Sequence, residues 1–292
     1  MPSPRILSRV ALTVACALTF TACGGGKPQV TPDNETDVST TALRQGDTSA
    51  STVAPATTRA GTATTAPIGT VAGASTTTAP PTGAPALQMR KGTNGRKVVA
   101  LTLDAGSDVG FTGQILDTLK AEQIKVSFGM TGKWAEQNPD MFRRIVADGH
   151  HLVNHTYSHK SWTGFSSSTA LLNREARIAE LDKAEQVFKS LAGANVTSKP
   201  WFRPPFGDVD NETDKLLGQM GYKYDALWTV DSLGWMGKTA AQIVEICRKG
   251  FVPGGILLFH VGEQSQDGNA LVQIIKEVRA AGLQPGSLLD VV

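Results

Sequence analysis

Residues 98–106, VVALTLDAG, set the architecture of this chain. The run before Asp104 is almost continuously apolar, as is typical of a parallel strand buried on both faces. A carboxylate at the end of such a strand is costly to bury unless it is paired or reactive. The stretch therefore predicts a central strand with a functional residue, Asp104, at its carboxyl end.

Short apolar runs alternate with helical patterns over the rest of the chain. We predict strands at residues 98–103, 126–129, 151–154, 200–203, 224–230 and 255–259, and one after residue 283. We predict helices at residues 112–122, 169–190, 214–220, 239–249 and 270–281, and another that begins at Asn138-Pro139. This alternation favours an α/β fold with a parallel sheet, and about seven units suit a small or incomplete barrel.

Five short motifs follow these predicted strands. They are LDAG (103–106), HTYSH (155–159), RPPFG (203–207), DSLGW (231–235) and LFH (258–260). In barrels of parallel strands, the loops at the strand carboxyl ends meet at one mouth, where the chemistry is done. We therefore expect the five motifs to form one site.

Two histidines in the second motif have the spacing of a metal site. His155 and His159 are four residues apart, so their imidazoles can reach one divalent ion from a single turn. The alternative is a pair of polar loop residues with no ligand. The spacing alone leaves both interpretations open.

From about Lys97 to Val292 the chain resembles the polysaccharide deacetylases, the NodB-like carbohydrate esterases of family four, because all five motifs occur in the family's order. The resemblance implies a distorted (β/α)7 barrel. It also implies that Asp104 is the general base, that Arg203 pairs with this base, and that His260 is the general acid. The alternative for Asp104 and Arg203 is a structural ion pair.

The resemblance also implies the substrate and metal contacts. Trp235 and Leu258 match the walls of an acetyl pocket, and a backbone N–H near Phe206 matches the oxyanion donor. His155 and His159 match ligands of a divalent metal. We expect zinc, with cobalt or nickel as alternatives.

The chain departs from the family pattern at two positions. The first motif usually ends Asp-Asp-Gly, with the second Asp a metal ligand, and here that residue is Ala105. The fourth motif usually ends Asp-Trp, and here the Asp is Gly234. We hypothesise that Asp108 replaces the missing ligand and that Asp231 replaces the missing partner of the acid histidine.

The first 23 residues have the pattern of a secretory leader. Arg5 and Arg9 precede an apolar run, Val10–Phe20, that is too short to span a bilayer. The leader ends FTAC, which resembles a bacterial lipobox with Cys23 as the lipidated residue. A plain secretory signal with an incidental cysteine is the alternative. We expect export and lipid anchoring to the outer face of a bacterial cell membrane.

Composition divides the rest of the chain in two. Residues 24–90 are rich in Thr, Ala, Pro and Gly, which predicts a disordered linker before a deacetylase-like domain at 91–292. The net charge of +2 is too small to indicate a nucleic-acid-binding surface. We expect a monomer that acts on a polysaccharide. Cys247 lies on an apolar helical stripe and is predicted to be a buried core thiol.

These patterns lead to one preferred function and two alternatives. We predict a metal-dependent hydrolase that removes N-acetyl or O-acetyl groups from an amino-sugar polysaccharide, such as peptidoglycan or a chitin-like polymer. The first alternative is a non-catalytic glycan-binding lipoprotein on the same fold, favoured by Ala105 and Gly234. The second is a structural surface protein, which the full set of polar motif residues disfavours.

Overall fold

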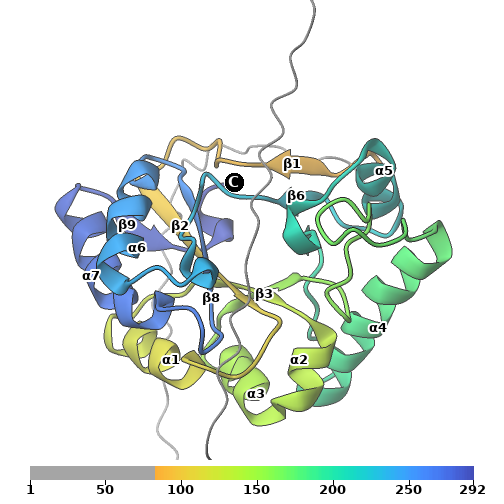
Figure 1. Ribbon diagram of the computed structural model, residues 1–292, viewed down its shortest axis with the longest axis horizontal. Helices are drawn as coiled ribbons and strands as arrows, with labels where there is room; N and C mark the ends of the chain where they lie inside the picture. Colours follow the sequence, from red (N-terminus) through yellow and green to blue (C-terminus); the bar gives the residue numbers. More distant parts are fainter. Residues whose placement is uncertain (1–82) are drawn as a thin grey trace, which may run out of the picture. The chain divides into compact units, whose positions relative to one another are not determined.

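Strand β2 (Val98–Ala105) lies at the centre of the sheet in the computed structural model, which describes residues 83–292 (Figure 1). It pairs with β3 (Ser127–Met130), β8 (Ile256–His260) and β9 (Gln284–Gly286). Every residue of β2 is buried. A strand with neighbours on both edges and packing on both faces requires the apolar run that residues 98–103 supply.

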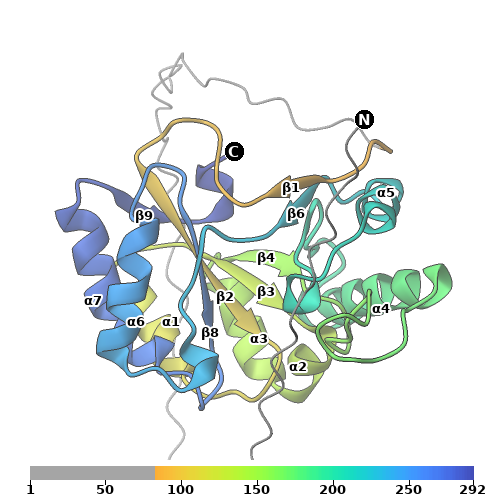
Figure 2. The same ribbon diagram turned by 45° about the horizontal axis from the view of Figure 1, so that its top comes forward.

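The sheet is parallel throughout and follows the order β1-β6-β5-β4-β3-β2-β8-β7, with β9 beside β2. The remaining strands are β1 (Leu87–Met89), β4 (His151–Asn154), β5 (Trp201–Phe202), β6 (Tyr224–Ala226) and β7 (Val230–Asp231). The sheet curls into a half-barrel whose two edges, β1 and β7, do not pair with each other within residues 83–292 (Figure 2). This confirms the predicted α/β fold with parallel strands in a distorted barrel.

Helices surround the convex side of the curled sheet. Helices α1, α6 and α7 lie on one side and α2, α3 and α4 on the other (Figure 2). Their bounds, with α5, are α1 (Thr112–Ala121), α2 (Gly132–Gln137), α3 (Pro139–Ala147), α4 (Arg174–Ala192), α5 (Asn211–Gln219), α6 (Ala240–Cys247) and α7 (Asp267–Ala280). In the region that the structure describes, no helix is both long and apolar enough to cross a bilayer.

Alternate residues of β2 face two different cores. Val99, Leu101 and Leu103 pack into the cluster beneath the helices. Val98 and Ala100 belong to a second cluster, inside the curl of the sheet. Since side chains alternate along a strand, Thr102 and Asp104 continue the inner row towards the carboxyl end. The inner row thus changes from apolar to polar as it reaches the mouth.

The structure corrects the predicted boundary of the linker. Residues 87–89 were assigned to the disordered segment, yet they form β1 and pair with β6. After β1 the chain reaches the C-terminal residues, where Asn94 donates side-chain hydrogen bonds to the carbonyl oxygens of Asp290 and Val292. These contacts are long-range, so composition did not indicate them. The predicted leader, Cys23 and most of the linker lie outside the described residues.

Two predicted elements differ from the structure, and one helix was not predicted. The strand expected at residues 224–230 is two strands, because β6 pairs with β1 and β5 whereas β7 pairs with β8. Helix α4 begins at Arg174 and not at Thr169, with Asn173 as its N-cap. The short helix α2 was not predicted. Its cap is Thr131, whose side chain accepts a hydrogen bond from the N–H of Trp134.

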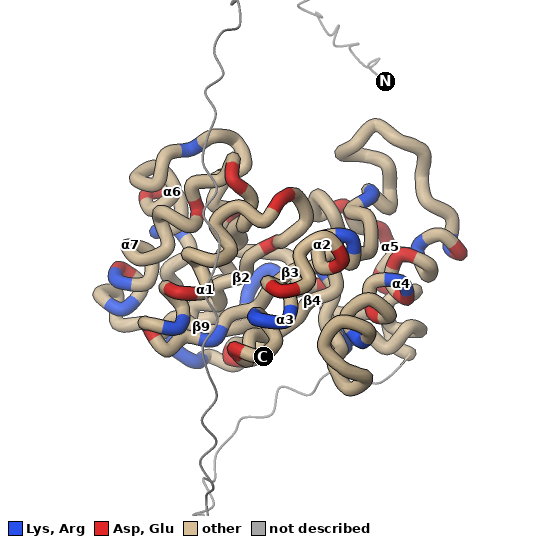
Figure 3. The backbone as a smooth tube through the Cα atoms, turned by 90° about the horizontal axis from the view of Figure 1, so that it is seen from below, with Lys and Arg blue, Asp and Glu red and all other residues tan. Residues whose placement is uncertain are grey.

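Charged residues of both signs are distributed over the helices. In the view of Figure 3, Lys and Arg positions and Asp and Glu positions are both scattered over the visible elements. This mixture agrees with the small net charge of the sequence.

Candidate active site

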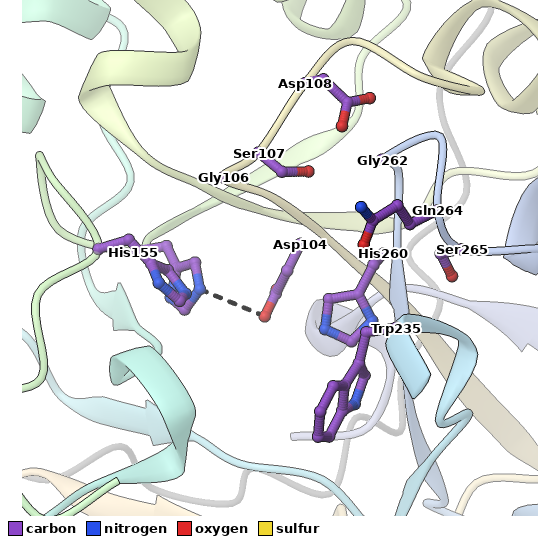
Figure 4. A pocket seen from close by; sticks show the side chains of 11 residues that line it. Asp104, Gly106, Ser107, Asp108, His155, Trp235, His260, Gly262, Gln264 and Ser265 are labelled. Atoms are coloured by element: carbon purple, nitrogen blue, oxygen red, sulfur yellow. Dashed lines mark ion pairs between the residues drawn. The ribbon is translucent and has the colours of Figure 1, made fainter. Parts of the chain in front are cut away.

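The five motifs meet at the carboxyl ends of the strands. Asp104 is the second-last residue of β2, His155 follows β4, Arg203 follows β5 and His260 ends β8. The side chains of Asp104, His155 and His260, with that of Trp235, border two adjoining hollows of about 330 and 500 Å³, and Figure 4 shows the smaller one. The expectation that the motifs form one site is therefore met by their positions.

A buried ion pair joins the first and third motifs. Nη1 of Arg203 donates to Oδ1 of Asp104 at 2.8 Å, and both side chains are more than nine-tenths buried. The other guanidinium nitrogens donate to the hydroxyl of Thr102 and to the carbonyl oxygen of Ala226. The opposite residue on β3 is Gly129, where a Cβ atom would overlap the Asp104 carboxylate. The glycine on the neighbouring strand thus leaves room for the Asp104–Arg203 ion pair.

This environment keeps Asp104 ionised. Burial by itself raises the pKa of Asp104, but the opposing interactions, of which the charge of Arg203 is the largest, lower the pKa below 3.8. An ionised carboxylate at the edge of a hollow can accept a proton from a nearby water.

His155 and His159 lie side by side with their rings nearly perpendicular, 4.7 Å apart between centroids. Nδ1 of His155 lies 2.9 Å from the carbonyl oxygen of Arg203, so this nitrogen carries the proton and donates it. A metal-binding histidine usually has its second ring nitrogen held in this way. Burial lowers the pKa of His155 below 6.5 and that of His159 to about 3. Both imidazoles are neutral, as metal ligation requires.

Helix α4 holds the turn that carries these imidazoles. The carboxylate of Glu180 accepts hydrogen bonds from the N–H and the hydroxyl of Ser158, both at 2.7 Å. The hydroxyl of Thr156 accepts from the N–H of His159. Sequence reasoning missed Glu180, because nothing in a helical pattern distinguishes an acidic residue that binds a distant loop from one that faces solvent.

Two imidazoles lie where the family binds a metal, and the position of the family's third ligand is Ala105, whose methyl group cannot ligate. Ala105 is fully buried among apolar neighbours. Within residues 83–292, no group of three or more His, Cys, Asp or Glu side chains is arranged to hold a metal ion. The two imidazoles fit a metal, but the set falls short of the three protein ligands usual in catalytic zinc sites.

The structure corrects the hypothesis that Asp108 supplies the third ligand. Oδ1 of Asp108 accepts a hydrogen bond from the N–H of Glu263 at 2.8 Å. Figure 4 shows this carboxylate apart from the imidazole of His155. Asp108 therefore ties the loop after β2 to the loop after β8 and does not complete a metal site.

The structure also places a different carboxylate beside His260. Both oxygens of Asp231 are used within its own motif, since they accept from the N–H of Leu233 at 2.8 Å and from Nε1 of Trp235 at 3.1 Å. Asp267, the first residue of α7, lies 3.7 Å from Nδ1 of His260. Sequence analysis missed Asp267, because its position after the last motif resembles that of an ordinary acidic residue in a first helical turn.

Aromatic and apolar side chains border the larger hollow. It is lined by Phe206, Trp228, Trp235 and Leu258 in addition to the polar residues. Phe206 is about half exposed and lies against His159, with 4.8 Å between ring centroids. Trp235 is also about half exposed, whereas Leu258 is buried. The hollow thus has an apolar wall beside its polar groups, as a pocket for an acetyl group requires.

Unusual backbone conformations concentrate in the motif loops. Thr156, His159, Phe206 and Leu233 all have a positive φ, which residues other than glycine rarely adopt. Such strain persists only where the surrounding structure holds it, and it clusters at functional sites. These four residues belong to the second, third and fourth motifs.

Comparison with known proteins agrees with this geometry. The sequence profile of the family described as "Polysaccharide deacetylase" matches residues 91–224, which include the first three motifs. A peptidoglycan-N-acetylglucosamine deacetylase of Bacillus cereus is 32% identical over 187 residues, 63% of this chain and 64% of that protein. A solved family 4 carbohydrate esterase from Bacillus anthracis is 30% identical, with a TM-score of 0.57 over 70% of this chain and 86% of that one.

The chain belongs to the polysaccharide deacetylases, the family 4 carbohydrate esterases. These are hydrolases that act on amide bonds of amino sugars and are typically metal-dependent. A family 4 pseudoenzyme from Bacillus anthracis shares the fold, with a TM-score of 0.63 at 22% identity over 70% of this chain and 68% of that one. The family resemblance found in the sequence is confirmed, while the chain spans 64% of the length of the Bacillus cereus relative.

Proposed function

We propose that this protein hydrolyses acetyl groups, N-linked or O-linked, from an amino-sugar polysaccharide of the cell wall. The observation that carries the proposal is the placement of two proton-transfer groups around one hollow. Asp104 is held ionised by Arg203, and His260 faces the same space with Asp267 behind it. The peptidoglycan substrate printed for the Bacillus cereus relative supports a similar polymer here.

The reaction follows from the charges of these groups. Asp104 accepts a proton from the water that attacks the acetyl carbonyl, and a backbone N–H near Phe206 stabilises the oxyanion. His260, protonated, then donates its proton to the departing amine. Water and the amide give acetate and a free amine, so the atoms balance. A divalent metal bound by His155 and His159 would supply polarisation of the carbonyl and a more acidic water.

One observation favours a second function, which is glycan binding without catalysis. Ala105 removes a ligand that the family uses, and the described residues do not replace it. The aromatic wall and the polar groups remain able to bind a sugar in that case. The Bacillus anthracis pseudoenzyme has the same fold, so this fold also occurs without activity.

Release of acetate distinguishes the two functions. The full chain is incubated with peptidoglycan and with N-acetylglucosamine oligomers, with and without added zinc, cobalt or nickel. Acetate release supports the hydrolase. Measurable glycan binding with no release under any of these conditions would transfer the proposal to the binding protein.

We expect the protein to bind one divalent ion through His155 and His159, because their neutral imidazoles face one hollow. Isothermal titration with zinc, cobalt and nickel measures this. The double variant His155→Ala/His159→Ala is expected to abolish uptake. The matched control is His150→Ala/His151→Ala, since those imidazoles instead contact the backbone of Val126 and the hydroxyl of Ser127. Equal uptake by both double variants would contradict the prediction.

A gain-of-ligand variant completes this test. Ala105→Asp restores the family's third ligand at the last position of β2, which Ala105 occupies. We expect tighter metal binding and a melting temperature that rises with metal, because binding stabilises the folded state. A fall in melting temperature that metal does not reverse would show a buried, unpaired carboxylate instead.

We also propose, from the sequence alone, that the protein is exported and anchored through lipid on Cys23, and that it acts as a monomer. The motivation is the FTAC motif after a short apolar run. Metabolic labelling with a radioactive fatty acid tests the anchor. Wild type and Cys23→Ala should differ in label and in membrane association. Equal labelling of the two contradicts the anchor.

A further inference from the structure

The loop between β8 and α7 places Asp267 beside His260, the proposed general acid. Asp267 is 2% exposed. Its Oδ2 accepts hydrogen bonds from the N–H of His260 at 2.7 Å, from the hydroxyl of Ser265 at 2.8 Å and from the hydroxyl of Ser232 at 3.0 Å. Three donors from three places in the chain therefore fix one carboxylate oxygen beside His260.

The position of Asp267 depends on the glycine in the fourth motif. A Cβ atom at Gly234 would lie 2.7 Å from Oδ1 of Asp267 and would overlap the hydroxyl oxygen of Ser265. The family's aspartate at this position and the present Asp267 cannot occupy the same space. The loss of one carboxylate and the presence of the other are thus linked by packing.

Each of the two side chains has one buried polar atom without a hydrogen-bond partner among the described residues, Nδ1 in His260 and Oδ1 in Asp267. At 3.7 Å, Oδ2 and Nδ1 form an ion pair and not a hydrogen bond. Catalytic hydrogen bonds are often long in structures without a ligand and shorten when substrate binds.

We propose that Asp267 is the positioning residue of His260, replacing from α7 the carboxylate that the fourth motif lacks. This inference rests on the proposed hydrolase function and assigns to that site a residue outside its five motifs. Asp267 orients the imidazole so that Nδ1 points inward and Nε2 faces the hollow. It also stabilises the protonated ring before the proton leaves for the amine.

Other titratable groups also lie near His260 and affect its pKa. Carboxylates come from three elements, as Asp104 on β2, Asp231 on β7 and Asp267 on α7. The imidazoles of His155 and His159 face it from the loop after β4. Burial lowers the pKa of His260, but Asp267, with Asp104 and Asp231, outweighs it and raises the pKa above 6.5.

The sign of the pH dependence follows from this direction. A histidine with a folded-state pKa above its unfolded value stabilises the fold fully below the unfolded pKa. It loses this contribution as the pH rises through the folded-state pKa. Asp267→Asn removes the charge and keeps the size of the side chain, so it should weaken this dependence.

The test is an NMR titration of the full chain labelled at its five histidines. We expect His260 to titrate above pH 6.5 in wild type, and about one to three pH units lower in Asp267→Asn. Asp231→Asn, the matched control, should give a smaller shift because its oxygens are engaged by Leu233 and Trp235. The alkaline limb of kcat/KM should move down with the His260 pKa in Asp267→Asn.

An exchange of residues tests the packing argument. Gly234→Asp alone should lower the melting temperature through overlap with Ser265 and Asp267. Gly234→Asp combined with Ser265→Ala and Asp267→Ala should recover the melting temperature and a His260 pKa above 6.5. Wild-type stability in Gly234→Asp alone, or no recovery in the combined variant, overturns the replacement.

The titration separates this inference from the proposed function. A wild-type His260 that titrates at or below pH 6.5 overturns the role of Asp267, whether or not acetate is released, and so does an unchanged His260 pKa in Asp267→Asn. The wild-type measurement stands even where a variant fails to fold. Absence of acetate release with the expected titration contradicts the hydrolase and leaves the pairing of Asp267 with His260 intact.

Discussion

Asp104→Asn is expected to lower the rate of acetate release by about 10²–10⁴-fold while the fold is retained. The substitution keeps the size of the side chain and an oxygen that can accept from Arg203, but it removes the negative charge that takes a proton from water. His260→Ala should cause a loss of similar size, because it removes the proposed acid, which is paired in register with Asp104 on the neighbouring strand β8. Rates of acetate release and far-UV circular dichroism are the measurements.

A surface substitution of the same kind controls for the loss of charge. Asp117→Asn changes an exposed carboxylate on α1 that pairs with Arg144 and lines neither hollow of the site. It should leave the rate unchanged. A folded Asp104→Asn variant with more than about a tenth of the wild-type rate would show that another group is the base.

Arg203→Met is expected to destabilise the protein by about 3–5 kcal/mol. The substitution leaves the Asp104 carboxylate buried without its partner, and it also removes the donors to Thr102 and Ala226. A buried ion pair that loses one member costs far more than an exposed pair does. Urea unfolding at pH 7, with the free energy extrapolated to water, gives the difference.

Two comparisons show whether the buried charge is the cause. Arg144→Met breaks a partly exposed pair with Asp117 and should cost less than about 1 kcal/mol. Asp104→Leu combined with Arg203→Met removes both charges and should recover much of the lost stability, since no unpaired carboxylate remains. Equal destabilisation in the single and double variants would assign the cost to packing and not to charge.

The candidate site was predictable in part, because its motifs follow strands. Each motif comes after a short apolar run, and parallel strands bring their carboxyl ends to one mouth, so Asp104, His155, Arg203 and His260 were expected to meet. Their chemical roles stay predictions until the variants are measured. The two replacements, Asp108 for Ala105 and Asp231 for Gly234, were chosen by proximity in sequence and are not supported by the structure.

What the sequence determined by itself was local. The buried run at residues 98–103 set the central strand, and the helical stripe of α1 set which residues it buries, because both depend on side-chain periodicity within one element. The order and spacing of the motifs indicated the family. The departures at Ala105 and Gly234 were also visible without a structure.

Tertiary structure alone decided the contacts between distant segments. It split residues 224–230 into β6 and β7, added β1 to the edge of the sheet, and placed Asp267 in the space that Gly234 leaves open. Each of these depends on packing between residues far apart in the chain, which periodicity within one element does not record. For that reason the absence of a carboxylate at Gly234 could be seen in the sequence, whereas the position of Asp267 beside His260 could be seen only in the folded structure.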